Sequence, residues 1–277
     1  MRTATEKYNE LLDRLEELGS CLVAYSGGVD STLLAFSGHA VLGPRCKAVL
    51  ATSDTYPSNE VESARSLARH LGLNLIEVET CELSDPRFAA NPPERCYYCK
   101  MELFGLITHV ADVHGLEYIA DGSNADDFTD FRPGSKAAAE YKVVSPLQDV
   151  GMTKDDIRAV ARELGLPNWD KPSMACLASR FPYGTPISEA GLERVAAAEN
   201  ALRQLGLTQF RVRAHDDMAR VEVAPEEMDR AWQLRTDVSK AVRAAGFTWV
   251  AQDMDGYRTG ALNESLPAPT IERITAR

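Results

Sequence analysis

The feature that most constrains this chain is a short glycine-containing loop between an apolar strand and a helix. An apolar run ends at Tyr25, residues 26–31 read Ser-Gly-Gly-Val-Asp-Ser, and Thr32–Phe36 continues as an apolar helix. Glycine lets a ligand approach the backbone closely, and successive N–H groups at a helix N-terminus bind phosphate. The segment therefore predicts an anion-binding loop in a strand–loop–helix unit.

Two common phosphate-binding loops do not fit this segment. It contains no lysine, so it differs from the Gly-x4-Gly-Lys-Ser/Thr loop that cradles a γ-phosphate, and it lacks the Gly-x-Gly-x-x-Gly spacing of dinucleotide-binding turns. The plain alternative is an ordinary Gly-Gly turn with a Ser/Asp helix cap. The fit of six residues at a strand-to-helix junction favours the anion-binding interpretation.

Strands and helices alternate through the first half of the chain. Apolar runs predict strands at 22–25, 46–51, 74–78 and 117–120. Amphipathic stretches that end at a glycine predict helices at 59–71, 101–114 and 153–164. This order predicts an α/β fold with a doubly wound parallel sheet, whose ligands bind at the carboxyl ends of the strands.

The pattern changes after a stretch rich in Pro, Ser and Gly at residues 167–188. Beyond it we expect a smaller α/β domain, with helices at 189–205 and 225–245 and strands at 210–213, 219–223 and 248–250. The predicted organisation is a nucleotide-binding domain at 1–170, an active-site loop or linker at 171–188, and a substrate-binding or oligomerisation domain at 189–277.

Charge and hydropathy limit the class of partner. The net charge is −11, from 30 basic and 41 acidic residues, and no run of Lys or Arg stands out. Such a surface disfavours nucleic acid as a partner. No apolar stretch approaches the ~20 residues of a membrane span, and the N-terminus reads as an amphipathic helix rather than a signal peptide. We therefore expect a cytoplasmic protein with a small-molecule substrate and no membrane partner.

A second polar segment follows the last predicted strand of the sheet. Residues 121–127 read Asp-Gly-Ser-Asn-Ala-Asp-Asp, and carboxylate and amide groups at a strand end suit Mg²⁺ and nucleotide contacts. Alone the segment is also consistent with a polar turn, where Asn and Asp are common. Its position beside the predicted anion-binding loop favours a shared site.

The six cysteines divide into two groups. Cys21 and Cys46 lie in apolar strands and read as core residues, whereas Cys81 carries no signal. Cys96 and Cys99 form a Cys-x-x-Cys pair, which is compatible with zinc, an iron–sulfur cluster or a redox dithiol. Cys176 lies in a Pro/Ser/Gly-containing loop with basic neighbours, which favour the nucleophilic thiolate and an anionic substrate.

The two polar segments resemble the signatures of the PP-loop ATP pyrophosphatases. The resemblance implies that the first loop holds the pyrophosphate end of ATP through Ser26, Gly27, Gly28, Asp30 and Ser31. It implies that Gly122, Ser123, Asn124 and Asp127 complete the ATP site. By position in that fold, Ser53 after the second strand is expected to lie near the adenine and ribose.

Three further stretches resemble the LarE family of ATP-dependent sulfur transferases. They are 91–100 (Asn-Pro-Pro-Glu-Arg-Cys-Tyr-Tyr-Cys-Lys), 171–184 with Pro-Ser-Met-Ala-Cys-Leu-Ala-Ser-Arg, and 255–263. The resemblance covers most of the chain. It implies that a carboxylate of pyridinium-3,5-biscarboxylic acid mononucleotide is adenylated with Mg-ATP and converted to a thiocarboxylate for nickel-pincer cofactor biosynthesis, with release of AMP and pyrophosphate.

The resemblance also implies residue roles. Members with three cysteines hold a [4Fe–4S] cluster that delivers sulfide, which here assigns Cys96, Cys99 and Cys176 as ligands. From their charge, and not from the resemblance, we expect Arg180 and Arg213 to contact the anionic substrate. Arg211 and Arg213 alternate along a predicted strand and so share a face. The family further implies a trimer-based homo-oligomer and leaves the sulfide donor unknown.

Three alternatives stay open at this point. Cys176 can itself be the sacrificial sulfur donor, which would leave dehydroalanine. A tRNA thiolation enzyme of the same superfamily also uses three cysteines, although the acidic surface argues against it. A zinc-stapled nucleotide-binding regulator without turnover would need a fourth ligand, which the sequence does not make evident.

Overall fold

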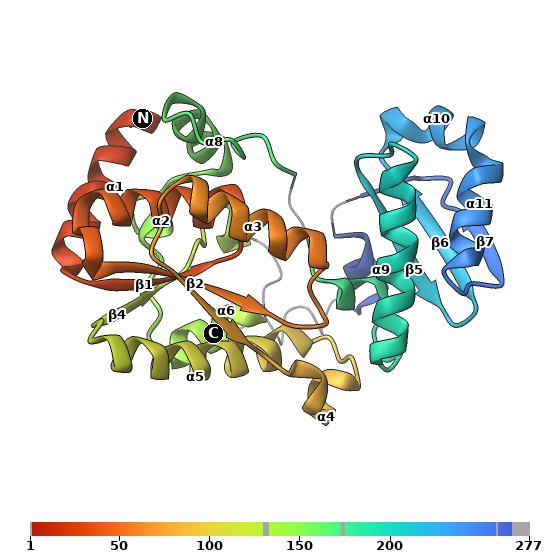
Figure 1. The fold of residues 1–277 in the computed structure, drawn as a ribbon, viewed down its shortest axis with the longest axis horizontal. Helices are drawn as coiled ribbons and strands as arrows, with labels where there is room; N and C mark the ends of the chain where they lie inside the picture. The colour runs from red at the N-terminus through yellow and green to blue at the C-terminus, as the bar shows by residue number, and fades with distance from the viewer. Residues whose placement is uncertain (1, 130–132, 173–174, 259, 268–277) are drawn as a thin grey trace. The chain divides into compact units, whose positions relative to one another are not determined.

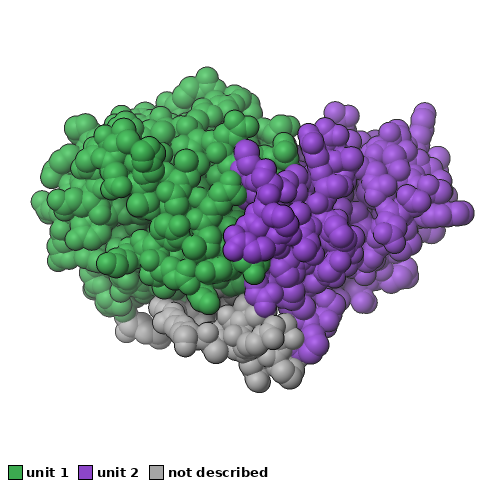
Figure 2. Space-filling view, turned by 90° about the horizontal axis from the view of Figure 1, so that it is seen from below, with its two compact units in different colours: residues 1–80, 96–174, 277 green, residues 81–95, 175–276 purple. Residues whose placement is uncertain are grey.

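The computed structural model describes residues 2–129, 133–172, 175–258 and 260–267. The chain forms two compact units, coloured separately in Figure 2. Unit 1 contains residues 1–80 and 96–174, and unit 2 contains residues 81–95 and 175–276. The sequence placed a boundary at residue 170, whereas unit 1 continues beyond it and the segment just before Cys96 is part of unit 2.

Unit 1 is built on the parallel sheet that the sequence predicts. Its strands are β1 (Cys21–Tyr25), β2 (Cys46–Thr52), β3 (Leu75–Glu79) and β4 (Tyr118–Ala120), in the order β3-β2-β1-β4. All three pairings are parallel, and Ala120 makes one further parallel bridge to Val144. The predicted α/β fold with a parallel sheet is confirmed. The order reverses beside β1, so the loops after β1 and β4 border the same crevice.

Side chains of β1 and β2 alternate between two hydrophobic cores. Val23, Tyr25 and Leu50 belong to one core, whereas Leu22 and Val49 belong to the other. This alternation follows from the two-residue period of a strand, and both sets are apolar because helices cover both faces of a parallel sheet. Burial on both faces explains why β1 reads as a continuous apolar run.

Helices on the two faces of the sheet come from different parts of unit 1 (Figure 1). The first core takes side chains from α1 (Ala4–Leu18), α2 (Val29–Leu42), α3 (Ser58–His70) and α8 (Lys154–Glu163). The second core takes them from α5 (Arg95–His114) and α6 (Gly134–Glu140). A short helix, α7 (Pro146–Asp149), precedes α8. Thr3 begins α1 and Thr153 begins α8 with a capping box.

Unit 2 contains a smaller sheet of three strands. They are β5 (Phe210–His215), β6 (Met218–Val223) and β7 (Trp249–Gln252); β5 and β6 are antiparallel, and β6 and β7 are parallel. The helix α9 (Glu189–Gln204) packs against β5 and against α11 (Arg235–Ala244). The one-turn helix α4 (Pro86–Ala89) is also part of this unit. The predicted small C-terminal α/β region is therefore present.

Two helix predictions were wrong in their extent. The helix predicted at 225–245 is divided into a 3-10 turn (Pro225–Glu227), α10 (Met228–Gln233) and α11, because Leu234 at the junction has φ −86° and ψ 7°, outside the α-helical range. The helix predicted to begin at 101 begins at Arg95, directly after Pro92-Pro93-Glu94. Both Cys96 and Cys99 therefore lie inside α5.

Phe104 provides a test of the packing between α5 and the sheet. Its side chain is 1% exposed and belongs to the core that contains Leu22 and Val49. Phe104→Ala should lower the free energy of unfolding by about 3–5 kcal/mol, because it removes buried area and leaves a cavity. Val113→Ala on the same helix, where the side chain is 68% exposed, should change it by no more than about 0.5 kcal/mol. Urea unfolding of both variants is the measurement, and equal losses would contradict the described packing.

Candidate active site

The loop after β1 is closed by two serine hydroxyls. The backbone N–H of Ser26 donates to Ser31 Oγ at 3.2 Å, and Ser31 Oγ donates to Gly28 O at 3.2 Å. The two hydroxyl oxygens of Ser26 and Ser31 lie 3.2 Å apart. Gly28 is the N-cap of α2 and has no side chain to cap the helix, so the first N–H groups of a 14-residue helix stay available to an anion.

Gly27 brings this loop into direct contact with α3. Its φ is 72°, and a Cβ at this position would lie 2.6 Å from the Cβ of Ala64. The neighbouring Tyr25 hydroxyl donates to Ala64 O at 3.0 Å, and burial raises the pKa of Tyr25 to about 12. The loop conformation therefore requires glycine both for its left-handed backbone and for its closeness to the helix.

The loop after β4 packs directly on the first one. A Cβ added to Gly122 would lie 2.9 Å from the backbone N of Ser31, so the two backbones touch. The Asn124 side chain is 5% exposed, its Oδ1 accepts the N–H of Asp126 at 3.0 Å, and its backbone N–H donates to Asp127 Oδ2 at 3.0 Å. The structure thus brings together two segments that the sequence separates by about ninety residues.

Asp30 is the acidic residue of the anion-binding loop, and it lies on the first turn of α2. One of its carboxylate oxygens forms an ion pair with Lys154 at the start of α8. The other oxygen, Oδ1, is buried and has no hydrogen-bond partner among the described residues. A buried carboxylate oxygen without a donor is a hard ligand of the kind Mg²⁺ takes, so this residue fits the expected metal.

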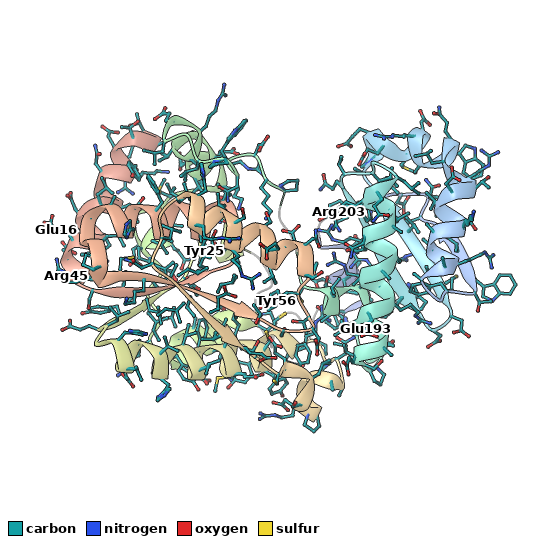
Figure 3. The ribbon with its side chains drawn as sticks, in the orientation of Figure 1. Glu16, Tyr25, Arg45, Tyr56, Glu193 and Arg203 are labelled. Atoms are coloured by element: carbon teal, nitrogen blue, oxygen red, sulfur yellow. The ribbon has the colours of Figure 1, made fainter. Side chains whose placement is uncertain are left out.

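A pocket lies at the carboxyl ends of β1 and β2. Its lining includes Ser26 from the loop, Tyr25, Tyr56 and Glu60, and Lys100 from α5. Tyr25 and Tyr56 are labelled in Figure 3. Sequence reasoning missed Tyr56, Glu60 and Lys100 as site residues, because only the folded sheet brings α3 and α5 to the same strand ends.

Ser53 follows β2 but is not part of that pocket lining. Its hydroxyl lies 2.8 Å from Thr55 Oγ1 and accepts the backbone N–H of Thr55 at 3.2 Å. These contacts stabilise the turn that leads into α3. The expected contact of Ser53 with adenine and ribose stays a prediction.

Cys96 and Cys99 lie three residues apart near the start of α5, and such pairs face the same side of a helix. Cys96 is exposed and Cys99 half-buried. Cys176 is half-buried at the start of a 3-10 turn, Leu177–Arg180, and its carbonyl accepts the Ser179 hydroxyl at 2.8 Å. The first two cysteines belong to unit 1 and the third to unit 2. Ser173 and Met174 of this motif, and Thr259 near the C-terminus, lie outside the described residues.

Arg180 is the largest fully buried side chain of the described chain, at 0% exposure. Its guanidinium donates to both carboxylate oxygens of Glu199, at 2.8 and 2.9 Å. The remaining nitrogen donates to the carbonyls of Ala175 and Cys176, at 2.7 and 3.0 Å, and to Ser179 Oγ at 3.0 Å. A forked cation thus fixes the backbone on both sides of the Cys176 side chain.

Two further buried arginines lie on β5. Arg213 donates to Glu222 Oε2 and to the carbonyl of Ser179, both at 2.7 Å. Arg211 stacks over the ring of Tyr257, and burial, followed by the nearby Arg180 charge, lowers its pKa. The substrate contacts expected of Arg180 and Arg213 stay predictions, and the contacts described for both are with the protein itself.

Asn91 ties the segment before α5 to the loop after Arg180 within unit 2. Its side chain is 0% exposed, and Nδ2 donates to the carbonyls of Pro182 and Thr185 at 2.7 and 3.0 Å. Its Oδ1 accepts from Arg95 at 2.7 Å, and the Arg95 guanidinium lies 4.9 Å from the Tyr183 ring centroid. The motif before Cys96 therefore has a structural role that its sequence did not reveal.

Two features are absent from the part of the chain that the structure describes. No helix in that part of the chain is long and apolar enough to cross a membrane. No group of three or more His, Cys, Asp or Glu side chains there is arranged to hold a metal ion.

Comparison with known proteins identifies the family. The chain is 42% identical over 265 residues to an uncharacterized protein of Synechocystis sp., covering 94% of this chain and 98% of that protein. It is 37% identical over 267 residues to the pyridinium-3,5-bisthiocarboxylic acid mononucleotide synthase of Lactiplantibacillus plantarum, covering 96% and 97%. The chain belongs to the family of this synthase, the LarE family. No protein-family model matches it.

A more distant relationship places the LarE-family chain in a wider superfamily. One of the subunits of the glutamine-hydrolyzing GMP synthase of Archaeoglobus fulgidus is 27% identical to it over 187 residues, which is 64% of this chain and 58% of the GMP synthase polypeptide. This relationship agrees with the parallel sheet and supports the predicted PP-loop. The LarE-family resemblance inferred from the three motifs is confirmed by the synthase of Lactiplantibacillus plantarum.

Gly122 tests the contact between the two loops. Gly122→Ala should weaken ATP binding by about tenfold or more, because its Cβ would displace the Ser31 N–H. In Gly28→Ala the new Cβ meets Ser26 Oγ at 3.4 Å, an ordinary contact, so the loss should be smaller. Calorimetric titration with Mg-ATP measures both. Equal affinity in the two variants would argue against a steric role for Gly122.

The Arg180–Glu199 pair tests the support of the Cys176 loop. Arg180→Met and Glu199→Leu should each lower the free energy of unfolding by about 3–5 kcal/mol, because each leaves the other charge buried without its partner. The double variant should lose less than the sum of the two. Chemical denaturation of all three variants gives the coupling, and simple additivity would contradict a direct ion pair.

Proposed function

We propose that this protein is an ATP-dependent sulfur transferase acting on pyridinium-3,5-biscarboxylic acid mononucleotide. A substrate carboxylate is adenylated, AMP and pyrophosphate are released, and a thiocarboxylate is formed. The name of the relative from Lactiplantibacillus plantarum supports the substrate. The contact between Gly122 and Ser31, which joins the two ATP-site segments, is the observation that supports ATP activation most directly.

The activation step assigns roles to the loop. A carboxylate oxygen of the substrate attacks the α-phosphorus of ATP, and the bond from that phosphorus to the bridging oxygen of pyrophosphate breaks. Ser26, Gly27, Gly28 and Ser31 surround the N-terminus of α2, whose N–H groups stabilise the charge that develops on pyrophosphate. Gly122, Ser123, Asn124 and Asp127 border the same end of the sheet.

Magnesium has a proposed ligand in Asp30. The unpartnered Oδ1 of this residue would contact the ion, and Lys154 pairs with the other oxygen. Bound Mg²⁺ supplies positive charge that offsets the phosphate oxygens. Asp30, on the first turn of α2, would thereby hold the ion.

Cys96, Cys99 and Cys176 are the proposed ligands of a [4Fe–4S] cluster. Three thiolates are a chemically suitable donor set, and such a cluster would supply the sulfide that replaces AMP on the activated carbonyl. Arg180 holds the backbone of Cys176 in place, which makes it a positioning residue. Arg213 is proposed to contact the anionic substrate through the part of its guanidinium not engaged by Ser179 and Glu222.

A second candidate keeps the same activation step but takes sulfur from Cys176 itself. The half-exposed thiol of Cys176 supports this alternative, because a donor sulfur has to reach the acyl carbon. We place the enzyme in the cytoplasm as a trimer-based homo-oligomer, with an unidentified sulfide donor and without nucleic acid or membrane partners. A tRNA thiolation activity is a further alternative, which the net charge of −11 disfavours.

Product analysis tests the activity. With Mg-ATP and the pyridinium substrate, the anaerobically purified protein should form AMP, pyrophosphate and the thiocarboxylate; omission of the substrate should abolish AMP formation. Cys176→Ala should retain substrate-dependent pyrophosphate release, because adenylation precedes sulfur transfer, and should lose the thiolated product, while Cys81→Ala should retain both. Thiolated product from Cys176→Ala would overturn the sulfur assignment.

Iron content and protein mass separate the two sulfur sources. The cluster hypothesis expects iron and sulfide in the purified protein, visible absorption that is lost in Cys96→Ala, and an unchanged protein mass after turnover. A colourless, iron-free protein that makes one product per chain and acquires dehydroalanine at position 176 would favour the sacrificial hypothesis.

A further inference from the structure

One carbonyl of the anion-binding loop is held by side chains that follow α8. Asn168 Nδ2 donates to Gly27 O at 3.1 Å and to Thr32 Oγ1 at 3.0 Å. Lys171 Nζ lies 3.5 Å from the same carbonyl and pairs with Glu60 at 2.8 Å. Asn168 is 8% exposed, so its hydrogen bonds are shielded from water. The loop is thus braced to both α2 and α3.

The contacts of Asn168 and Lys171, here called the brace, act on the peptide group between Gly27 and Gly28. In a trans peptide the carbonyl oxygen and the next N–H point in opposite directions. The Gly27 carbonyl faces Asn168, whereas the Gly28 N–H lies 3.4 Å from Ser26 Oγ, beside the Ser31 hydroxyl. The donor side of this peptide therefore faces the hydroxyls and the helix N-terminus, where the anion is expected.

A Gly–Gly peptide needs such a constraint. Glycine populates positive and negative φ almost equally, so this peptide plane can rotate at little conformational cost. A rotated plane would turn the Gly27 carbonyl, a hydrogen-bond acceptor, toward the phosphate oxygens and remove one donor from the site. Asn168 opposes that rotation by holding the carbonyl from behind.

We propose that Asn168 is a positioning residue for pyrophosphate recognition, and that Lys171 assists it. Asn168 fixes the Gly27–Gly28 peptide with its N–H toward the pyrophosphate group of ATP. Lys171 donates a second hydrogen bond to the Gly27 carbonyl. It also places a positive charge beside a loop that has no lysine of its own. The proposal rests on the proposed function, since it takes the loop to hold pyrophosphate.

Binding of the two reaction products separately is the test. The full-length protein is titrated with Mg-pyrophosphate and, in a second experiment, with AMP. Asn168→Ala should weaken pyrophosphate binding by about tenfold, the effect of losing one buried hydrogen bond, and should change AMP affinity by less than about twofold. Asn168→Asp should weaken it further, because a carboxylate cannot donate to the carbonyl and repels the anion.

Lys171→Met provides a second variant that does not open the core, since this side chain is 22% exposed. It should weaken pyrophosphate binding by about threefold, and Lys171→Arg should restore most of the loss. Lys240→Met on the exposed face of α11 removes the same charge elsewhere and should leave both affinities unchanged. Melting temperatures of all variants are recorded alongside.

Two results would overturn the proposal. One is a pyrophosphate affinity that is unchanged in both single variants, Asn168→Ala and Lys171→Met. The other is an equal loss of AMP and pyrophosphate affinity in the folded variants, which would make the brace a general support of the fold. Neither result depends on sulfur transfer. A wild-type protein that binds both products selectively but never thiolates the substrate would contradict the proposed function alone.

Discussion

The close approach of backbones at the carboxyl end of β1 is the constraint on which the rest of the site depends. Gly27 lies against Ala64 of α3, and Gly122 lies against the backbone of Ser31. Neither contact leaves room for a Cβ. Because both positions are glycine, two helices and two loops converge on one helix N-terminus, whose first backbone N–H groups have no side-chain cap.

The cations that surround this site come from later in the chain. Lys154 reaches Asp30 from the start of α8, and Lys171 reaches the loop carbonyl beside Asn168. These positive charges are arranged around the loop without occupying the turn itself. In unit 2, a fully buried Arg180 is paired with Glu199 and donates directly to the backbone carbonyls of Ala175 and Cys176.

Most of the α/β architecture was predictable because it follows from local pattern. Apolar runs bounded by glycines identified all four strands of the first sheet, and the loop after β1 identified its ligand class. Element boundaries were less predictable. The start of α5 at Arg95 and the break at Leu234 depend on packing and backbone angles that no local signal records. The pocket residues Tyr56, Glu60 and Lys100 were missed for the same reason.

The sequence by itself determined the family and the parallel sheet, and it predicted the residues of two ATP-site segments, because glycine spacing and strand-end polarity are local properties of the chain. Only the tertiary structure decided that Gly122 contacts Ser31, that Asn168 holds the Gly27 carbonyl, and that Arg180 is buried against Glu199. Those contacts join residues far apart in sequence. They exist only once the sheet has fixed where each strand ends.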